Sequence, residues 1–112
     1  MIAYKGTKNF RCGNMQYQVG KTYAFKGSSE LVHKYGFHVC KNIADVDQYY
    51  PFSDSDTVVL EVEIPDNALV IEDKESEFSV LVTNKLKVLR ILTKKDIERV
   101  ANGKVKFDKT AI

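Results

Sequence analysis

The chain has 112 residues, 44% of them apolar and 29% charged, which is typical of a soluble globular domain. This length provides one hydrophobic core and excludes two, so we expect a single domain over residues 1–112. No segment approaches the roughly 18 consecutive apolar residues of a membrane helix, and the N-terminus lacks a signal peptide's apolar stretch. We therefore expect no membrane association and a cytoplasmic location, with Cys12 and Cys40 reduced.

The net charge of +2 conceals three blocks of opposite sign. Residues 1–41 carry seven basic and one acidic side chain, whereas residues 42–77 carry one lysine and eleven carboxylates. Residues 78–112 carry nine basic and three acidic side chains. An acidic middle can steer a charged partner. Folding can equally bring the blocks together so that they neutralise one another, and the sequence leaves both interpretations open.

The N-terminal quarter of the chain predicts short strands and turns. Residues 2–5 are expected to open a strand that stops at Gly6, and the polar stretch 7–13 is expected to be a loop. Residues 16–19 and 22–25 alternate apolar and polar side chains around a glycine and a lysine. This pattern predicts a β-hairpin.

The next stretch predicts helix, strand and helix in turn. A short helix is expected over 28–35, ended by Gly36, and a strand over 37–40. A second short helix is expected to begin after Asn42 and to end at Pro51. Three residues fall on one face of that helix: Ile43, Val46 and Tyr50.

The second half predicts mainly strands. The clearest is 57–64, where apolar and polar residues alternate, and further strands are expected over 69–71, 78–82 and 85–92. A last short helix is expected to be capped by Thr93 and to end at Asn102-Gly103. Because strands and helices do not alternate as βαβ units, the fold class is α+β with mostly antiparallel strands and two or three short helices.

Four motifs in this order resemble the ADP-ribosyltransferase fold, particularly its poly(ADP-ribose) polymerase and diphtheria-toxin branch. They are Tyr4-Lys5-Gly6-Thr7, Gly36-Phe37-His38 with a helix reaching Tyr49, Leu60-Glu61-Val62, and Glu77-Phe78 before a strand pair. The resemblance implies two antiparallel sheets and NAD as the substrate. It also implies the NAD-binding residues Gly6, Thr7, Gly36, His38 and Tyr49.

The same resemblance implies the catalytic residues. Lys5 would contact the ribose, Tyr49 would stack on the nicotinamide ring, and Glu77 would stabilise the cationic ribose as nicotinamide leaves. Glu75 would complete a Glu-x-Glu pair. The chain departs from the family pattern at Lys5, where histidine or arginine is typical, and at His38, where tyrosine is typical.

A second resemblance covers nearly the whole chain. Several segments are similar to an uncharacterised domain of phage and prophage proteins: Ala3-Tyr4-Lys5-Gly6, Cys12, Tyr17-Gln18-Val19-Gly20-Lys21-Thr22-Tyr23, Gly36-Phe37-His38-Val39-Cys40 and Asp45-Val46-Asp47-Gln48-Tyr49-Tyr50-Pro51. This resemblance implies a phage-derived protein acting inside a bacterial host, and the family brings no assigned activity.

Two functions follow from these observations. The first, which the altered motif positions favour, is a catalytically silent module that binds a host protein or another host macromolecule through residues 42–77. The second is an NAD-dependent mono-ADP-ribosyltransferase that modifies a host protein or nucleic acid. The oligomeric state is not indicated.

Other chemistries are less well supported by the residue pattern. Cys12, His33, His38 and Cys40 match no zinc-binding spacing, so no metal is expected. A nucleophilic pair of His38 and Cys40 lacks an orienting group. The basic residues between Lys85 and Arg99 have no interleaved aromatic residues, so nucleic acid is not the expected partner.

Overall fold

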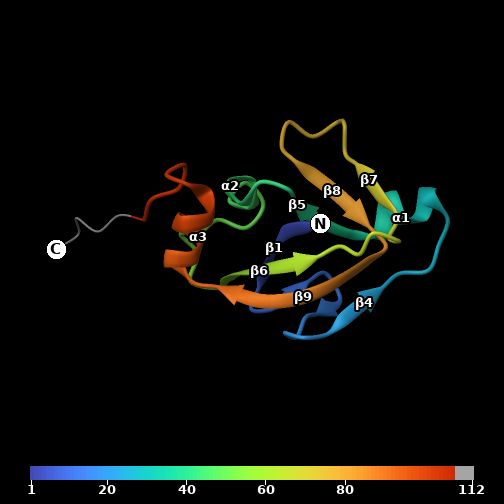
Figure 1. Ribbon diagram of the computed structural model, residues 1–112, viewed down its shortest axis with the longest axis horizontal. Coiled ribbons are helices and arrows are strands. Elements are labelled where there is room, and N and C mark those ends of the chain that lie inside the picture. Colours follow the sequence, from blue (N-terminus) through green and yellow to red (C-terminus); the bar gives the residue numbers. More distant parts are fainter. Residues whose placement is uncertain (108–112) are drawn as a thin grey trace.

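The computed structural model describes residues 1–107, so the last five residues of the expected domain lie outside the described part. Within it, nine strands and three helices follow one another along the chain (Figure 1). The strands are β1 (Ile2–Lys8), β2 (Arg11–Cys12), β3 (Met15–Gln16), β4 (Thr22–Ala24), β5 (Phe37–Cys40), β6 (Thr57–Glu63), β7 (Val70–Glu72), β8 (Val80–Thr83) and β9 (Lys85–Leu92). The helices are α1 (Ser29–Tyr35), α2 (Ile43–Val46) and α3 (Lys94–Ala101).

The strands form one antiparallel sheet in the order β4-β9-β6-β1-β5-β8-β7, with the β2–β3 hairpin attached to β1. This confirms the α+β class with antiparallel strands. The expected division into two sheets is wrong, because hydrogen bonding continues from β1 to β5. That junction is narrow: β1 pairs with β6 from Ile2 to Lys8, but with β5 only at Tyr4 and Cys40. Beyond this pair the two strands leave a gap in the sheet.

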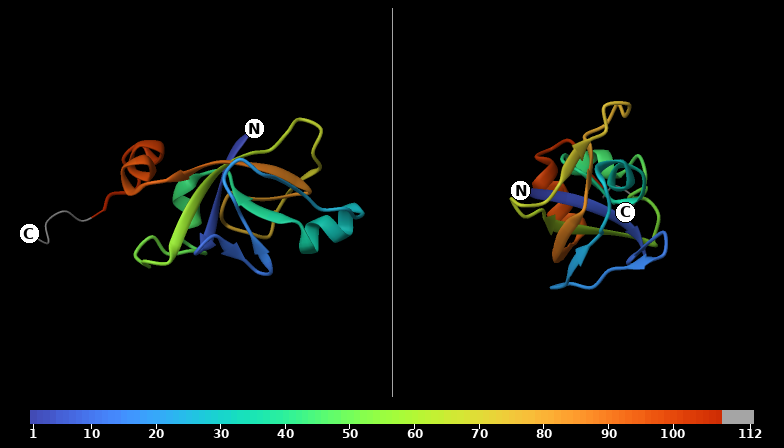
Figure 2. Two further views of the ribbon diagram at one scale, coloured as in Figure 1. Left: turned by 90° about the horizontal axis from the view of Figure 1, so that it is seen from below. Right: turned by 90° about the vertical axis from the view of Figure 1, so that its right-hand side faces the viewer.

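The core is divided between the two faces of the sheet. Strand β6 shows the division, because Leu60 and Val62 belong to one buried cluster and Val59 to the other. The cluster containing Val59 is covered by α2 and α3, which contribute Ile43 and Ile97. Figure 2 shows α3 beside one end of the sheet and α1 near the opposite end.

The N-terminal segment differs from the sequence prediction. The stretch expected to be a loop carries the end of β1 and the β2–β3 hairpin, because Asn9 and Phe10 both adopt positive φ angles and turn the chain back within two residues. The expected hairpin around Gly20 is wrong. Strand β4 pairs with β9 instead, and the Gly20 amide donates to the Val88 carbonyl across the same edge.

Local signals predicted the helices better. The Thr93 side chain accepts from the Asp96 amide, and the Asp96 carboxylate accepts from the Thr93 amide, which is the expected capping box. Helix α3 ends at Ala101 and is followed by Asn102 in the left-handed conformation, which confirms the predicted end at Asn102-Gly103. Helix α2 is shorter than expected, although the Tyr50 amide still donates to the Val46 carbonyl and keeps Tyr50 on the predicted face.

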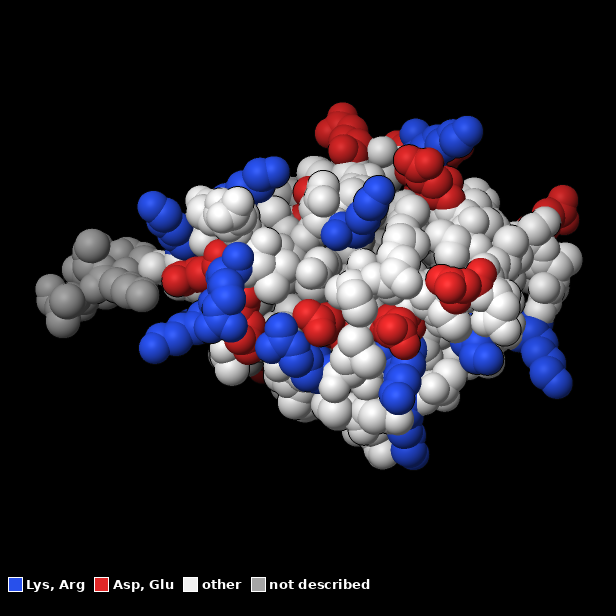
Figure 3. Space-filling model, in the orientation of Figure 1, with Lys and Arg blue, Asp and Glu red and all other residues white. Residues whose placement is uncertain are grey.

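Charged side chains of both signs are interspersed over the face shown in Figure 3. The Arg90 guanidinium lies 3.3 Å from the Glu61 carboxylate and 3.5 Å from that of Asp96. Glu61 belongs to the acidic middle block and Arg90 to the basic C-terminal block. Folding therefore brings at least part of the two blocks together.

Candidate functional site

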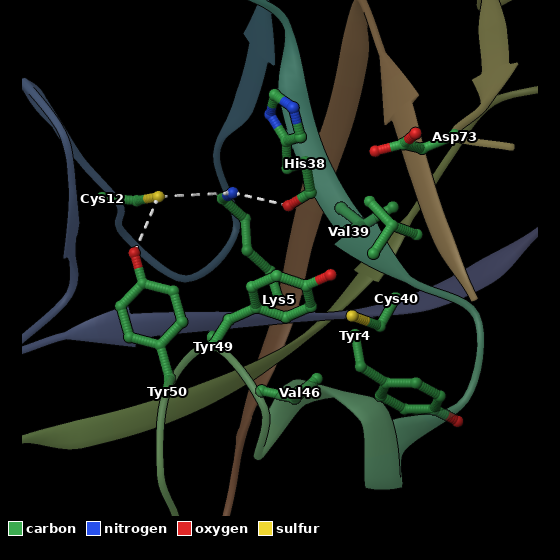
Figure 4. Close-up of a pocket in the computed structure, with 12 residues that line it drawn as sticks. Tyr4, Lys5, Cys12, His38, Val39, Cys40, Val46, Tyr49, Tyr50 and Asp73 are labelled. Atoms are coloured by element: carbon green, nitrogen blue, oxygen red, sulfur yellow. Dashed lines mark hydrogen bonds between the residues drawn. The ribbon is translucent and has the colours of Figure 1, made fainter. Parts of the chain in front are cut away.

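A cavity of about 270 Å³ lies where β1 and β5 separate. Its walls come from β1, β5, the hairpin at Cys12, the segment after α2, and the segment after β7 (Figure 4). The residues with polar or aromatic side chains that line it are Tyr4, Lys5, Cys12, His38, Cys40, Tyr49, Tyr50 and Asp73. The narrow junction in the sheet thus forms a small site with both charged and aromatic walls.

Lys5 is the central polar group of this cavity. Its side chain is buried, with the residue only 2% exposed, and extends between Cys12 and β5 (Figure 4). The ammonium donates to the His38 carbonyl at 2.8 Å and contacts the Cys12 sulfur at 3.7 Å. Burial lowers the pKa of Lys5, and the neighbouring Cys12 opposes that shift. Within residues 1–107, no carboxylate lies within ion-pairing distance of Lys5.

Cys12 sits between two donors. The Tyr50 hydroxyl donates to the Cys12 sulfur at 3.1 Å, in addition to the Lys5 contact (Figure 4). Burial and this hydrogen bond raise the pKa of Tyr50 to about 12, so the phenol stays protonated as a donor. Gly6 makes the arrangement sterically feasible, because a Cβ there would lie 2.5 Å from a Tyr50 ring carbon.

The outer part of the cavity carries Tyr49, His38 and Asp73. Tyr49 is 51% exposed, and its hydroxyl lies 3.0 Å from the Ser76 hydroxyl in the segment after β7. Desolvation, and then the charge of Lys5, lower the pKa of His38. Asp73 places a carboxylate on the side of the cavity away from Cys12 (Figure 4).

Four of the residues singled out from the sequence meet at this cavity: Lys5, Gly6, His38 and Tyr49. The other four lie elsewhere. The Gly36 carbonyl oxygen lies 3.2 Å from the His38 ring nitrogen, but Gly36 itself does not line the cavity.

Thr7 is fully buried and hydrogen-bonded to the backbone of Val58 and Phe10. Glu75 and Glu77 are exposed on either side of Ser76 and do not line the cavity.

Sequence reasoning missed Cys12, Tyr50 and Asp73 as parts of one site. No sequence pattern pairs Cys12 with Lys5, because their contact depends on the unpredicted β2–β3 hairpin. Asp73 belongs to the same acidic segment as Glu75 and Glu77, the two residues that the resemblance to ADP-ribosyltransferases implied. Its proximity to the cavity is set by β7 pairing with β8, which no local motif encodes.

Two other features of the described residues bear on function. No group of three or more histidine, cysteine, aspartate or glutamate side chains in residues 1–107 is placed to hold a metal ion. No helix in the same residues is long and apolar enough to cross a membrane.

The chain is therefore an α+β domain with a lysine-containing cavity at a narrow point of its sheet. A family model described as a domain of unknown function, DUF7666, matches residues 1–101, which include all the residues of this cavity. The chain belongs to this family. No curated protein and no solved structure matches the chain.

Proposed function

We propose that this domain binds a small planar molecule carrying an anionic group, with the Lys5 ammonium as the anchor. The observation that carries the proposal is the position of the Lys5 side-chain nitrogen, which is buried at the cavity wall without a carboxylate partner in residues 1–107. An ammonium has three protons, of which two are directed at the His38 carbonyl and Cys12. Because an uncompensated buried charge costs several kcal/mol, an anion in the cavity offsets a penalty the protein otherwise carries.

The remaining walls favour a planar ligand. Tyr4, Tyr49 and Tyr50 line the same cavity, and aromatic rings offer flat apolar surfaces for stacking. Asp73 supplies an acceptor for a ligand N–H or O–H on the side away from Cys12. At about 270 Å³, the cavity is near the lower limit of ligand sites and suits a group with one ring.

A second candidate function is transfer of ADP-ribose from NAD. Its support is the convergence of Lys5, Gly6, His38 and Tyr49, all singled out through the resemblance to ADP-ribosyltransferases, around one cavity. The cavity suits the nicotinamide end, and the rest of NAD would lie outside it. Asp73 is the carboxylate on the cavity wall, whereas Glu77 is exposed outside. We place binding first because neither predicted catalytic glutamate lines the site.

A host macromolecule as partner, and a phage origin, stay predictions from the sequence. The proposed ligand site depends on neither, because it is defined by the side chains that line the cavity, which include Tyr49, Tyr50 and Asp73 of residues 42–77. The carboxylates of residues 42–77 that lie outside the cavity would then serve a separate contact.

The test compares nicotinate with nicotinamide, which share a ring and differ in carrying a carboxylate or a neutral amide. Ligand-observed NMR should show nicotinate binding more tightly to the wild-type protein. Lys5→Met should weaken nicotinate binding about tenfold or more, since it removes a charge-assisted hydrogen bond. Lys87→Met is the matched control: Lys87 is exposed on β9, so binding should not change. Equal binding of nicotinate to the wild type and to Lys5→Met would refute the proposal that Lys5 anchors the ligand.

Two further experiments test the contact of Tyr49 with the ligand and the second candidate function. Tyr49→Ala should weaken binding, whereas Tyr49→Phe should retain it if the ring and not the hydroxyl contacts the ligand. Incubation with NAD, read by release of nicotinamide, tests transfer. Cleavage lost in Asp73→Asn would favour the enzyme. Failure of all three compounds to bind at millimolar concentration would refute both candidates for these ligands.

A further inference from the structure

Lys5 and Cys12 form a contact that the binding proposal treats only as a hydrogen bond. The lysine nitrogen lies 3.7 Å from the Cys12 sulfur, close to the separation from which a bond can form. The hairpin that carries Cys12 is fixed by pairing of Arg11 with Gln16 and of Cys12 with Met15. The two groups are therefore held together by the β-structure.

Cys12 is also open to small reagents. It is partly exposed and lines two cavities, the one described above and a larger one of about 480 Å³ that includes Phe25 and Tyr35. The second cysteine provides a contrast within the same chain. Cys40 is 5% exposed and lies in the core cluster beneath α2, and burial raises the pKa of its thiol to about 11. An oxidant should therefore reach and react with Cys12 first.

We propose that Cys12 is an oxidation site whose product is trapped by Lys5 as a reversible sulfur–nitrogen crosslink, with a peroxide as the oxidant. In the first step the Cys12 sulfur attacks the peroxide, the O–O bond breaks, and a sulfenic acid and one water are formed. In the second step the lone pair of the Lys5 amine attacks that sulfur, and the S–O bond breaks. The nitrogen loses a proton, a second water leaves, and the S–N bond remains.

Each neighbour has a defined part in this chemistry. The Tyr50 hydroxyl, 3.1 Å from the sulfur, can donate to the departing oxygen. The same burial that lowers the pKa of Lys5 increases the fraction of free amine available to attack. The product neutralises the buried charge of Lys5 and removes the anchor from the ligand cavity. The crosslink itself does not depend on whether a ligand binds there.

The experiment treats the wild-type protein with hydrogen peroxide in small excess, digests it with trypsin without reductant, and identifies the products by mass spectrometry. A modified Lys5 is not cleaved, so the crosslink joins peptides 1–8 and 12–21 and lowers their summed mass by about two units for the lost hydrogens. Oxidised Met1 and Met15 in these peptides are recognised by their added oxygen. Treatment with dithiothreitol should restore the two separate peptides.

Variants of Cys12, Cys40 and Lys5 identify the two residues that the crosslink joins. Cys40→Ser should form the crosslink as the wild type does, and Cys12→Ser should not form it. Lys5→Met should give a sulfenic acid at Cys12 that dimedone labels, without a crosslink. Three results in the wild type would overturn the proposal without recourse to any variant: oxidation of Cys40 before Cys12, conversion of Cys12 to sulfinic acid with Lys5 still cleaved, or a link from Cys12 to Lys8.

Discussion

Thr7→Val separates a structural role from a ligand-binding role at a position that the sequence assigned to the cofactor. Thr7 is completely buried, and its hydroxyl donates to the Val58 carbonyl at 2.8 Å and accepts from the Phe10 amide at 3.2 Å. These bonds tie β1 to β6 and hold the turn that starts the β2–β3 hairpin. Valine keeps the branched shape of threonine and removes only the hydrogen-bonding group.

The expected loss of stability follows from the groups that are left without partners. A buried donor or acceptor deprived of its partner costs about 1–3 kcal/mol. A domain of this size loses roughly 4 °C in melting temperature for each kcal/mol, so Thr7→Val should lower the melting temperature by about 4–12 °C. In urea, the midpoint should fall while the slope of the unfolding free energy stays unchanged.

The control is Thr22→Val, because Thr22 is exposed on the edge strand β4 and the change there should stay within about 0.5 kcal/mol. Nicotinate binding, measured well below the melting temperature, should be the same in Thr7→Val and in the wild type. Unchanged stability with lost binding would refute this reasoning. Thr7 would then be a ligand residue, as the resemblance implied.

Three further changes test the packing and the buried thiol. Gly6→Ala should destabilise by about 1–3 kcal/mol in urea unfolding, because its Cβ would overlap the Tyr50 ring and Val46; full stability would show that this contact relaxes freely. Thr93→Ala should cost about 1 kcal/mol in the same assay through loss of the α3 capping box, and no loss would show that packing alone holds the helix. Burial raises the pKa of Cys40 from 9.0 to about 11, so this thiol contributes stability that is present below pH 9 and lost as the pH rises towards 11. Cys40→Ala should therefore flatten the pH dependence of unfolding by up to about 2 kcal/mol over that range, and identical wild-type and variant profiles would contradict this.

The sequence predicted best where the signal was local. Strand β6 was readable from its alternation of apolar and polar residues, and α3 from Thr93 at its start and Asn102-Gly103 at its end. In both cases the residues that define the element lie within it or beside it. The antiparallel α+β class followed from the order of such elements.

Pairing over long distances was not readable in this way. Alternation on both sides of Gly20 is compatible with a hairpin, but the β4 segment pairs with β9, more than 60 residues away along the chain. The positive φ angle of Phe10 was equally unexpected, because bulky residues rarely adopt it. The Thr7 hydroxyl bonded to the Phe10 amide helps hold that turn.

The candidate site combines residues that local motifs identify with residues that only long-range strand pairing brings into place. Lys5, Gly6 and His38 were singled out from motifs on β1 and β5, which meet at Tyr4 and Cys40. Cys12 reaches them through the β2–β3 hairpin, and Asp73 through the pairing of β7 with β8. Motif order therefore found the part of the site on the central strands. The part contributed by peripheral segments required the fold.

Lys5 and Thr7 show that two buried polar residues on one strand can differ in their roles. They are two positions apart on β1, and both are at most 2% exposed. The hydroxyl of Thr7 is neutral and its hydrogen bonds are completed by backbone groups, so burying it is compatible with a purely structural role. Lys5 has the His38 carbonyl and the Cys12 sulfur as its partners, and no carboxylate in residues 1–107 pairs with it. A methionine would fill the same space without that cost. Both of our proposals start from what an amine adds at this position, since it can attract an anion or form a bond to the Cys12 sulfur.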